Sequence, residues 1–226
     1  MLKKYIYYFF AVLGSFLFVA CNNDDDLVDE EWKSENEWAY NKIVTNQDTI
    51  EWTPIVDTPS GIPEGVYYNI IRRGGGKEKP FQTASVKALF KGYFYDGSVF
   101  STNTSENATI NVHDELPEVG EPNVIYILWE EDKYTTHIWL EGENMWQEGD
   151  FEIVSQDFRV NGMVPGFSIA LQNMVVGDKW RVCIPYHLGY KTTGSSSSTG
   201  KVIVPGYSTL FFEIELLEIN QYPSQV

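Results

Sequence analysis

The run from residue 163 to residue 177 is the part of this sequence that most constrains the fold. The turn Met163-Val-Pro-Gly-Phe167 leads into an apolar face that Phe167, Leu171 and Met174 share at helical spacing. Gly177 stands where helices commonly end on a left-handed residue, so we expect the helix to stop there. A short helix of this kind needs a larger surface on which to bury its apolar face.

Strand patterns occur on both sides of this helix in the sequence. Residues 66–71 are expected to form a strand, and side chains alternate over 86–95, 180–184 and 210–216, with Phe90 and Phe94 on the same face of the first. Asp96-Gly97 is a hairpin-turn signature. A Gly- and Ser-rich stretch over 191–201 predicts a long loop before the last strand. Together these patterns predict an α+β fold, in which a curled antiparallel β-sheet is wrapped around one short α-helix.

The segment from residue 103 to residue 157 is too long to be a loop without structure of its own. Apolar β-type runs over 124–129 and 135–140 predict an inserted hairpin or small sheet. This β-rich insertion carries Trp129, Trp139 and Trp146. They are expected to form a satellite core; the alternative is a surface for a partner or a glycan.

The N-terminal residues are predicted to form a secretory signal. Lys3 and Lys4 precede an apolar run over 5–20 that is too short for a comfortable membrane span. Cys21 follows the small Ala20 and precedes a polar, acidic tether, which is the arrangement of a lipidated cysteine. The tether resembles the acidic export signal of surface lipoproteins in Bacteroidetes-type bacteria. We expect an outer-membrane lipoprotein of the cell envelope, exposed on the cell surface or facing the periplasm; the alternative is an ordinary signal peptide with an incidental cysteine.

Charge and cysteine content exclude several classes of protein. The formal net charge of −16 repels nucleic acid, so we exclude nucleic-acid binding. If Cys21 carries lipid, Cys183 has no disulfide partner and is expected to be a small buried apolar residue. The three histidines, His113, His137 and His187, lack metal-ligand spacing.

Residues 66–101 and 158–219 closely resemble the FKBP-type peptidyl-prolyl cis-trans isomerases. The resemblance rests on the P-G-F turn, on the I-P-x-x-L-G-Y segment that ends at Tyr190, and on the Y-S-T-L-F-F run that ends at Phe212. It implies a folding helper that accelerates rotation about Xaa–Pro bonds and needs no cofactor or metal. Its partners would be proline-containing peptides or unfolded exported proteins.

The resemblance and the composition shifts together divide the chain. Residues 29–44 show apolar spacing typical of a helix, and such an N-terminal arm in related bacterial proteins packs on the domain or on a second subunit, so an oligomer is possible. The alternative is a partly ordered arm. The predicted parts are a signal peptide (1–20), an acidic tether after lipidated Cys21 (21–30), an N-terminal helical arm and linker (31–65), an FKBP-like domain (66–219) with an insertion (103–157), and a tail (220–226).

Prolyl isomerisation requires a dry, concave and aromatic pocket. The barrier of about 18–20 kcal/mol comes from amide resonance, and an apolar pocket shaped for the twisted amide lowers it. The resemblance assigns the catalytic pocket to Phe90, Phe100, Phe167, Tyr190 and Phe212. It assigns substrate contacts to Ser101, Met163, Val164, Ile203 and Val204, with a main-chain amide of the 163–164 segment and the Tyr190 hydroxyl binding substrate carbonyls.

Three positions depart from the family pattern. Ser101 replaces the usual aspartate, Phe90 replaces the pocket tyrosine that the aspartate orients, and Phe167 replaces the floor tryptophan. These changes keep the apolar cavity and remove its polar groups. We therefore expect weakened isomerase activity; the alternative is a non-catalytic domain that binds a peptide or partner.

Overall fold

The computed structural model describes residues 29–57, 65–103, 109–113, 116–120, 124–130, 133–149 and 156–221. Its helices within these ranges are α2 (Glu30–Val44), α3 (Pro165–Leu171) and the single 3-10 turns η1 (Val160–Gly162) and η2 (Tyr186–Leu188). The strands of the main sheet are β1 (Thr53–Pro54), β2 (Tyr67–Arg72), β3 (Ser85–Tyr93), β4 (Val99–Thr102), β9 (Gln156–Arg159), β10 (Lys179–Ile184) and β13 (Leu210–Gln221).

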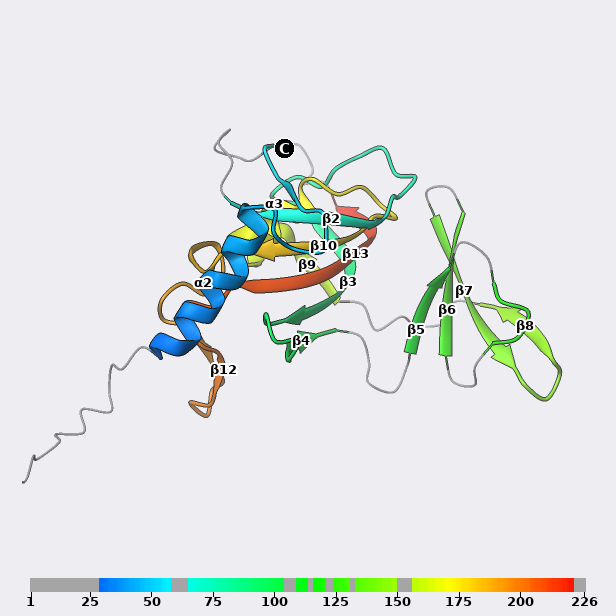
Figure 1. Ribbon diagram of the computed structural model, residues 1–226. Coiled ribbons are helices and arrows are strands. Elements are labelled where there is room, and N and C mark those ends of the chain that lie inside the picture. Colours follow the sequence, from blue (N-terminus) through cyan, green and yellow to red (C-terminus); the bar gives the residue numbers. More distant parts are fainter. Residues whose placement is uncertain are drawn as a thin grey trace, which may run out of the picture. The chain divides into compact units, whose positions relative to one another are not determined.

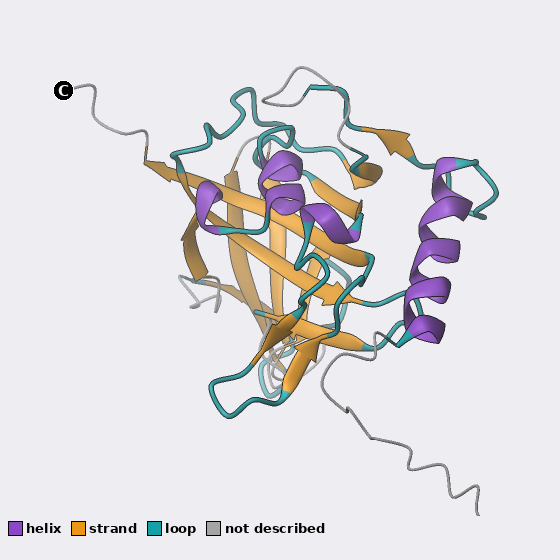
Figure 2. Ribbon diagram, turned by 90° about the vertical axis from the view of Figure 1, so that its left-hand side faces the viewer, coloured by secondary structure: helices purple, strands orange, loops and turns teal. Residues whose placement is uncertain are grey.

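The main sheet is antiparallel throughout and curls around α3. Its order is β1-β2-β10-β13-β3-β4, and β9 also pairs with β3. Figures 1 and 2 show α3 lying across one face of the curled sheet, with α2 at its side. The predicted α+β fold, with an N-terminal helical arm and a β-rich insertion, is confirmed.

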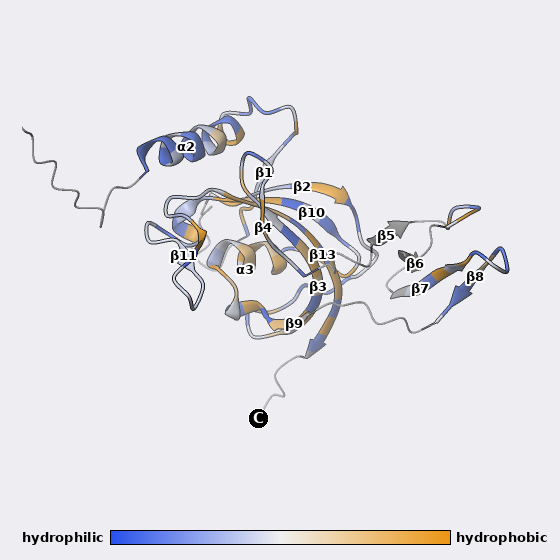
Figure 3. Ribbon diagram, turned by 90° about the horizontal axis from the view of Figure 1, so that it is seen from below, coloured by the Kyte–Doolittle hydropathy of each residue, from blue (hydrophilic) through white to orange (hydrophobic). Residues whose placement is uncertain are grey.

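The core lies between α3 and the concave face of the sheet. All residues of α3 after Pro165 are buried, and alternate residues of β10 and β13, such as Val182 and Ile214, pack against them. The alternation is visible as hydrophobic and hydrophilic bands along the strands in Figure 3, where α2 is mostly hydrophilic. Pro165 begins α3, a position where a missing N–H breaks no helical bond.

The predicted end of this helix was wrong. α3 ends at Leu171, and Gly177, with φ +92°, lies in the turn that enters β10. The N–H of Gly177 donates to the Leu216 carbonyl at 2.8 Å, and a Cβ on this residue would lie 2.8 Å from Gly74 Cα. The glycine is therefore required by sheet contacts and not by the helix end.

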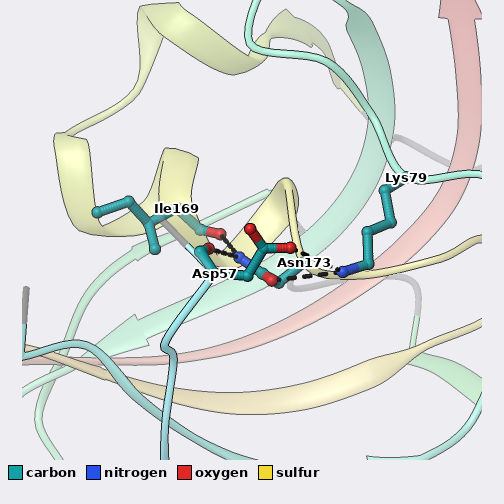
Figure 4. A network of polar contacts seen from close by, with 4 residues as sticks. All are labelled: Asp57, Lys79, Ile169 and Asn173. Carbon is teal, nitrogen blue, oxygen red and sulfur yellow. Dashed lines mark hydrogen bonds and ion pairs between the residues drawn. The ribbon is translucent and has the colours of Figure 1, made fainter. Parts of the chain in front are cut away.

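Asn173 ties the end of α3 to two loops (Figure 4). Its Nδ2 donates to the carbonyls of Ile169 at 2.9 Å and Asp57 at 2.8 Å. Lys79 Nζ lies 3.4 Å from Asp57 Oδ2 and 3.5 Å from Asn173 Oδ1. One amide thus satisfies a carbonyl of the last helical turn and fixes the linker before β2.

One edge of the sheet is split between two strands. β4 pairs with the Tyr93 end of β3, and β9 pairs with the Ser85 end. Beyond β4, Asn103 Oδ1 accepts the Phe90 N–H at 2.8 Å and Asn103 Nδ2 donates to the Ala88 carbonyl at 2.7 Å. This side chain replaces ladder bonds where the insertion leaves the edge, and so holds Phe90 in its strand.

The insertion contains a second sheet, which we describe by itself. Its strands are β5 (Thr109–His113), β6 (Val124–Glu130), β7 (Lys133–Leu140) and β8 (Met145–Glu148), with β5 parallel to β6 and the other pairs antiparallel. The ring of Trp146 contacts those of Tyr126 and Trp139 at 4.7 and 5.1 Å, and its Nε1 donates to the Pro117 carbonyl at 2.9 Å. Buried Tyr126 and Trp139 favour the satellite-core interpretation. The Trp129 side chain lies outside the described residues.

Several sequence predictions also lie outside the described residues. They are the signal peptide, the lipidated Cys21, most of the acidic tether and most of the tail. No helix within the described ranges is long and apolar enough to cross a membrane. The loop predicted over 191–201 contains β11 (Ser195–Ser196), which pairs with β12 (Val202–Val204).

Candidate functional site

Four of the five predicted pocket rings form one cluster. Phe167, at the start of α3, lies with its centroid 4.9 Å from that of Phe212 on β13 and 5.7 Å from that of Phe90 on β3. Phe100, on β4, lies 5.5 Å from Phe212, and the planes of the two rings are inclined by 85°. These edge-to-face contacts are the geometry that aromatic rings prefer.

Burial divides the cluster into a floor and walls. Phe167 is 0% exposed and Phe212 is 4% exposed, whereas Phe90 and Phe100 are half-buried. Gly92 lies beside the walls, and a Cβ on it would come within 2.7 Å of both Phe100 and Phe212. A side chain at this position would therefore displace two of the rings.

The turn before α3 supplies a backbone donor. Val164 precedes the helix, and its carbonyl accepts the N–H groups of Phe167 at 3.0 Å and Ser168 at 3.1 Å. Within the described residues, the Val164 N–H has no hydrogen-bond acceptor. The neighbouring Met163 N–H, by contrast, donates to the Val160 carbonyl at 3.4 Å. Met163 and Val164 are both half-buried against the core. This arrangement leaves the Val164 amide able to bind a ligand carbonyl.

Tyr190 and the β12 strand lie at the edge of the same core. Tyr190 and buried Val204 both pack against the core cluster that contains Phe167, while Ile203 is exposed. Burial raises the pKa of the Tyr190 hydroxyl above its ordinary value, so this group stays protonated at neutral pH and can donate a hydrogen bond. Within the described residues Tyr190 makes no ring contact with the four-ring cluster, although it packs against the same core.

The polar position beside the walls is occupied by Ser101. In the β3–β4 pair Ser101 lies opposite Gly92, so it shares a face with Phe90, diagonally across the ladder. Both side chains are half-buried. The structure therefore brings together two of the three positions that depart from the family pattern, Phe90 and Ser101, and neither carries a carboxylate or a phenol.

Sequence reasoning missed two rings that touch the predicted set. Phe158 on β9 lies 6.0 Å from Phe167 and 6.2 Å from Phe90, and Phe94 lies 4.9 Å from Phe100. Phe94 was assigned to the inward face of its strand, which was a usable signal. Phe158 had no such signal, because only the pairing of β9 with β3 brings it to the cluster.

Comparison with known proteins finds similar sequences. Residues 133–217 match the family model described as FKBP-type peptidyl-prolyl cis-trans isomerase. The FKBP-type 22 kDa peptidyl-prolyl cis-trans isomerase of Escherichia coli strain K12 is 29% identical over 155 residues, which is 69% of this chain and 50% of the relative. The macrophage infectivity potentiator of Trypanosoma cruzi is 28% identical over 159 residues, which is 70% of this chain and 55% of the relative.

A solved structure shows the same fold. The crystal structure of a peptidyl-prolyl cis-trans isomerase from Pseudomonas syringae pv. tomato strain DC3000 matches with a TM-score of 0.51 at 18% identity, and the match covers 84% of this chain and 96% of that chain. The chain spans about half the length of the curated relatives it matches.

Proposed function

Because the chain belongs to the FKBP-type peptidyl-prolyl cis-trans isomerase family, we propose that its aromatic cluster binds Xaa–Pro segments and accelerates their cis–trans isomerisation. The observation that carries this proposal is the convergence of Phe90, Phe100 and Phe212 over the buried Phe167 ring. The pyrrolidine ring of proline would lie against the half-buried rings of Phe90 and Phe100, above the buried Phe167.

The chemistry requires only binding, desolvation and a backbone donor. Amide resonance stabilises the planar peptide bond, and water stabilises its charge-separated form. Apolar walls exclude that water and so favour the twisted amide, in which the resonance is lost. The Val164 amide and the Tyr190 hydroxyl would hold the carbonyls on either side of the rotating bond, so that binding energy is used for the twisted geometry.

We further propose that turnover is weak. Phe90 lacks a hydroxyl and Ser101 lacks a carboxylate, so the polar pair expected in this pocket is missing. The same feature favours a second candidate function, in which the domain binds a proline-containing peptide or a partner without catalysing isomerisation.

An isomerisation assay with a proline tetrapeptide tests both candidates. Acceleration above the uncatalysed rate supports the enzyme, and peptide binding without acceleration supports the binding domain. Neither candidate survives if the protein does not bind the peptide, or if Phe167→Ala binds it as tightly as the unchanged protein.

We propose that this activity is located at the cell envelope. Cys21 follows a signal-like segment and precedes the acidic run Asn22–Asp26, which supports lipid anchoring. Exported proteins would then be the substrates. Metabolic labelling with radioactive palmitate should mark the full-length protein and should not mark Cys21→Ser; equal labelling of both would contradict the anchor.

A further inference from the structure

We propose that the first turns of α2 position two walls of the proposed pocket, and that Trp32 is the main positioning residue. One wall is the β3–β4 pair, which carries Phe90 and Phe100, and the second wall is β12 with the loop that leads to β13. α2 lies outside residues 133–217, the segment that matches the family model. The inference rests on the proposed function for its binding readout. Its structural readout is independent of that function.

The helix reaches the β3–β4 wall through aromatic contacts. The Trp32 ring meets Phe94 edge to face, with centroids 5.1 Å apart and planes inclined by 84°. Phe94 in turn lies 4.9 Å from the pocket residue Phe100. Glu35, one turn further along α2, accepts a hydrogen bond from the Tyr95 hydroxyl. Only one ring therefore separates Trp32 from the pocket wall.

The same turns of α2 hold the loop between β12 and β13. Trp32 Nε1 donates to Ser208 Oγ at 3.1 Å, and Ser208 Oγ donates to the Pro205 carbonyl at 2.7 Å. Asn36 is completely buried; its Oδ1 accepts the Thr209 N–H at 2.8 Å, and its backbone carbonyl accepts from Thr209 Oγ1 at 3.0 Å. Asn36 Nδ2 donates to the Trp32 carbonyl at 2.8 Å, which links the two residues within α2.

The two walls belong to different sheets. β4 is a short edge strand held by its pairing with β3, whereas β12, which carries Ile203 and Val204, pairs with β11 in a separate two-stranded sheet. Strand pairing between the walls therefore does not set the distance between them. α2 contacts both walls, and its Trp32 side chain joins them: its ring contacts Phe94 and Tyr95, with centroids 5.1 and 5.5 Å away, and its N–H donates to Ser208.

The chain offers a matched control on the same helix. Trp38 lies on α2 but is 60% exposed, and its ring is covered only on one side by the Lys42 ammonium, 4.6 Å from the centroid. Trp32→Ala and Trp38→Ala remove the same side chain from the same helix. Trp38 borders the same cavity as Phe94 and Tyr95, but within the described residues only Trp32 makes ring contacts or a hydrogen bond to the walls. Trp32→Phe keeps a ring against Phe94 and removes the indole N–H.

The experiment compares these three variants with the unchanged full chain, at a temperature where circular dichroism shows all of them folded. The dissociation constant of a proline tetrapeptide should rise about two- to tenfold in Trp32→Ala, as the loss of one aromatic contact implies. It should rise less in Trp32→Phe and stay unchanged in Trp38→Ala. This graded rescue is not expected of a merely structural role.

Amide exchange provides the second readout, which needs no peptide. The Thr209 N–H is bonded to Asn36, and the Gly97 N–H is bonded to the Phe94 carbonyl at 2.9 Å. Both should exchange about tenfold faster in Trp32→Ala and at the normal rate in Trp38→Ala. If the unchanged protein binds no proline peptide, the proposed function fails, and the exchange rates alone decide whether α2 orders the walls. Equal exchange in the two alanine variants, or equal peptide affinity where the peptide binds, overturns the inference.

Discussion

The ring of Phe167 meets the ring of Phe212 edge to face, with centroids 4.9 Å apart and planes inclined by 82°. Phe167 lies in the first turn of α3 and Phe212 lies on the last strand, β13. Their contact therefore joins the helix to the sheet at the floor of the proposed pocket. The pocket and the hydrophobic core are therefore continuous. Changes at the floor should alter stability and binding together.

Phe167→Ala should lower the free energy of unfolding by about 3–5 kcal/mol, because it opens a cavity at a fully buried position. It should also abolish binding of a proline peptide. Urea unfolding followed by fluorescence measures the first effect and calorimetric titration the second. Phe81→Ala is the control, because Phe81 is 63% exposed and its loss should change stability by less than about 0.5 kcal/mol. Equal losses in the two variants would contradict the buried floor.

Arg72→Ala should be strongly destabilising. Arg72 Nη2 lies 2.6 Å from Glu215 Oε1, and the Glu215 side chain is only 4% exposed. Removing the arginine leaves a buried carboxylate without its cation, which should lower the free energy of unfolding by about 3–5 kcal/mol. Lys87→Ala is the control, since its pair with Glu218 is partly exposed and should contribute less than about 1 kcal/mol. A double-mutant cycle with Glu215→Gln gives the coupling; a coupling near zero would exclude this role.

The double change Phe90→Tyr with Ser101→Asp should raise the isomerisation rate. The two positions share a face of the β3–β4 pair, so a new phenol and carboxylate can form the missing hydrogen bond. We expect kcat/KM to rise about fivefold, which corresponds to one hydrogen bond of about 1 kcal/mol. Each single change should give less than the pair. An unchanged rate in the double variant would mean that these positions do not limit turnover, and strictly additive effects would mean that the two groups do not act as a hydrogen-bonded pair.

Peptide binding should be constant from about pH 6 to pH 9 and should weaken above about pH 10, where tyrosine ionises. Burial raises the pKa of the Tyr190 hydroxyl above the ordinary value for tyrosine. The neutral donor form therefore persists through neutral and mildly alkaline pH and is lost only as the pH rises through the raised pKa. Tyr190→Phe should bind more weakly at neutral pH and should lose any alkaline dependence that this hydroxyl causes. Titrations at several pH values measure both effects. Unchanged affinity in Tyr190→Phe would show that the hydroxyl does not bind the peptide.

Cys183 should resist alkylation in the folded protein. Its side chain is fully buried in β10. Burial is the main cause that raises the pKa of the thiol well above its usual value, and the negative charge of Asp48 adds to it. The reactive thiolate is therefore scarce as well as inaccessible. Iodoacetamide labelling followed by mass spectrometry should modify Cys183 only after denaturation. Rapid labelling of the native protein would show that β10 opens readily.

Residue patterns were sufficient for the fold class and for the faces on which several aromatic side chains lie. Alternation places Phe90 and Phe212 on inward faces, and the turn before Phe167 identifies the start of the helix, because these features depend on local geometry. The helix was predicted to end at Gly177 but ends at Leu171, since a glycine with positive φ has the same sequence signature in a helix cap and in a sheet turn.

Other features depend on contacts between distant parts of the chain. Three contacts each require a specific pairing of strands. Glu215 is buried against Arg72, Phe158 lies beside Phe90, and Asn103 completes the edge of β3. Asn36 likewise appears as an ordinary polar residue of a helix until the Thr209 amide is placed against it.

By itself, the amino-acid order determined which residues face inward, where the chain turns, and that aromatic side chains would make up the core. Those properties follow from the period of a strand or helix and from the burial of apolar surface. Only the tertiary structure decided that α2 holds both walls of the pocket, because hydrogen bonds and ring contacts between distant segments depend on three-dimensional distances that no periodicity encodes.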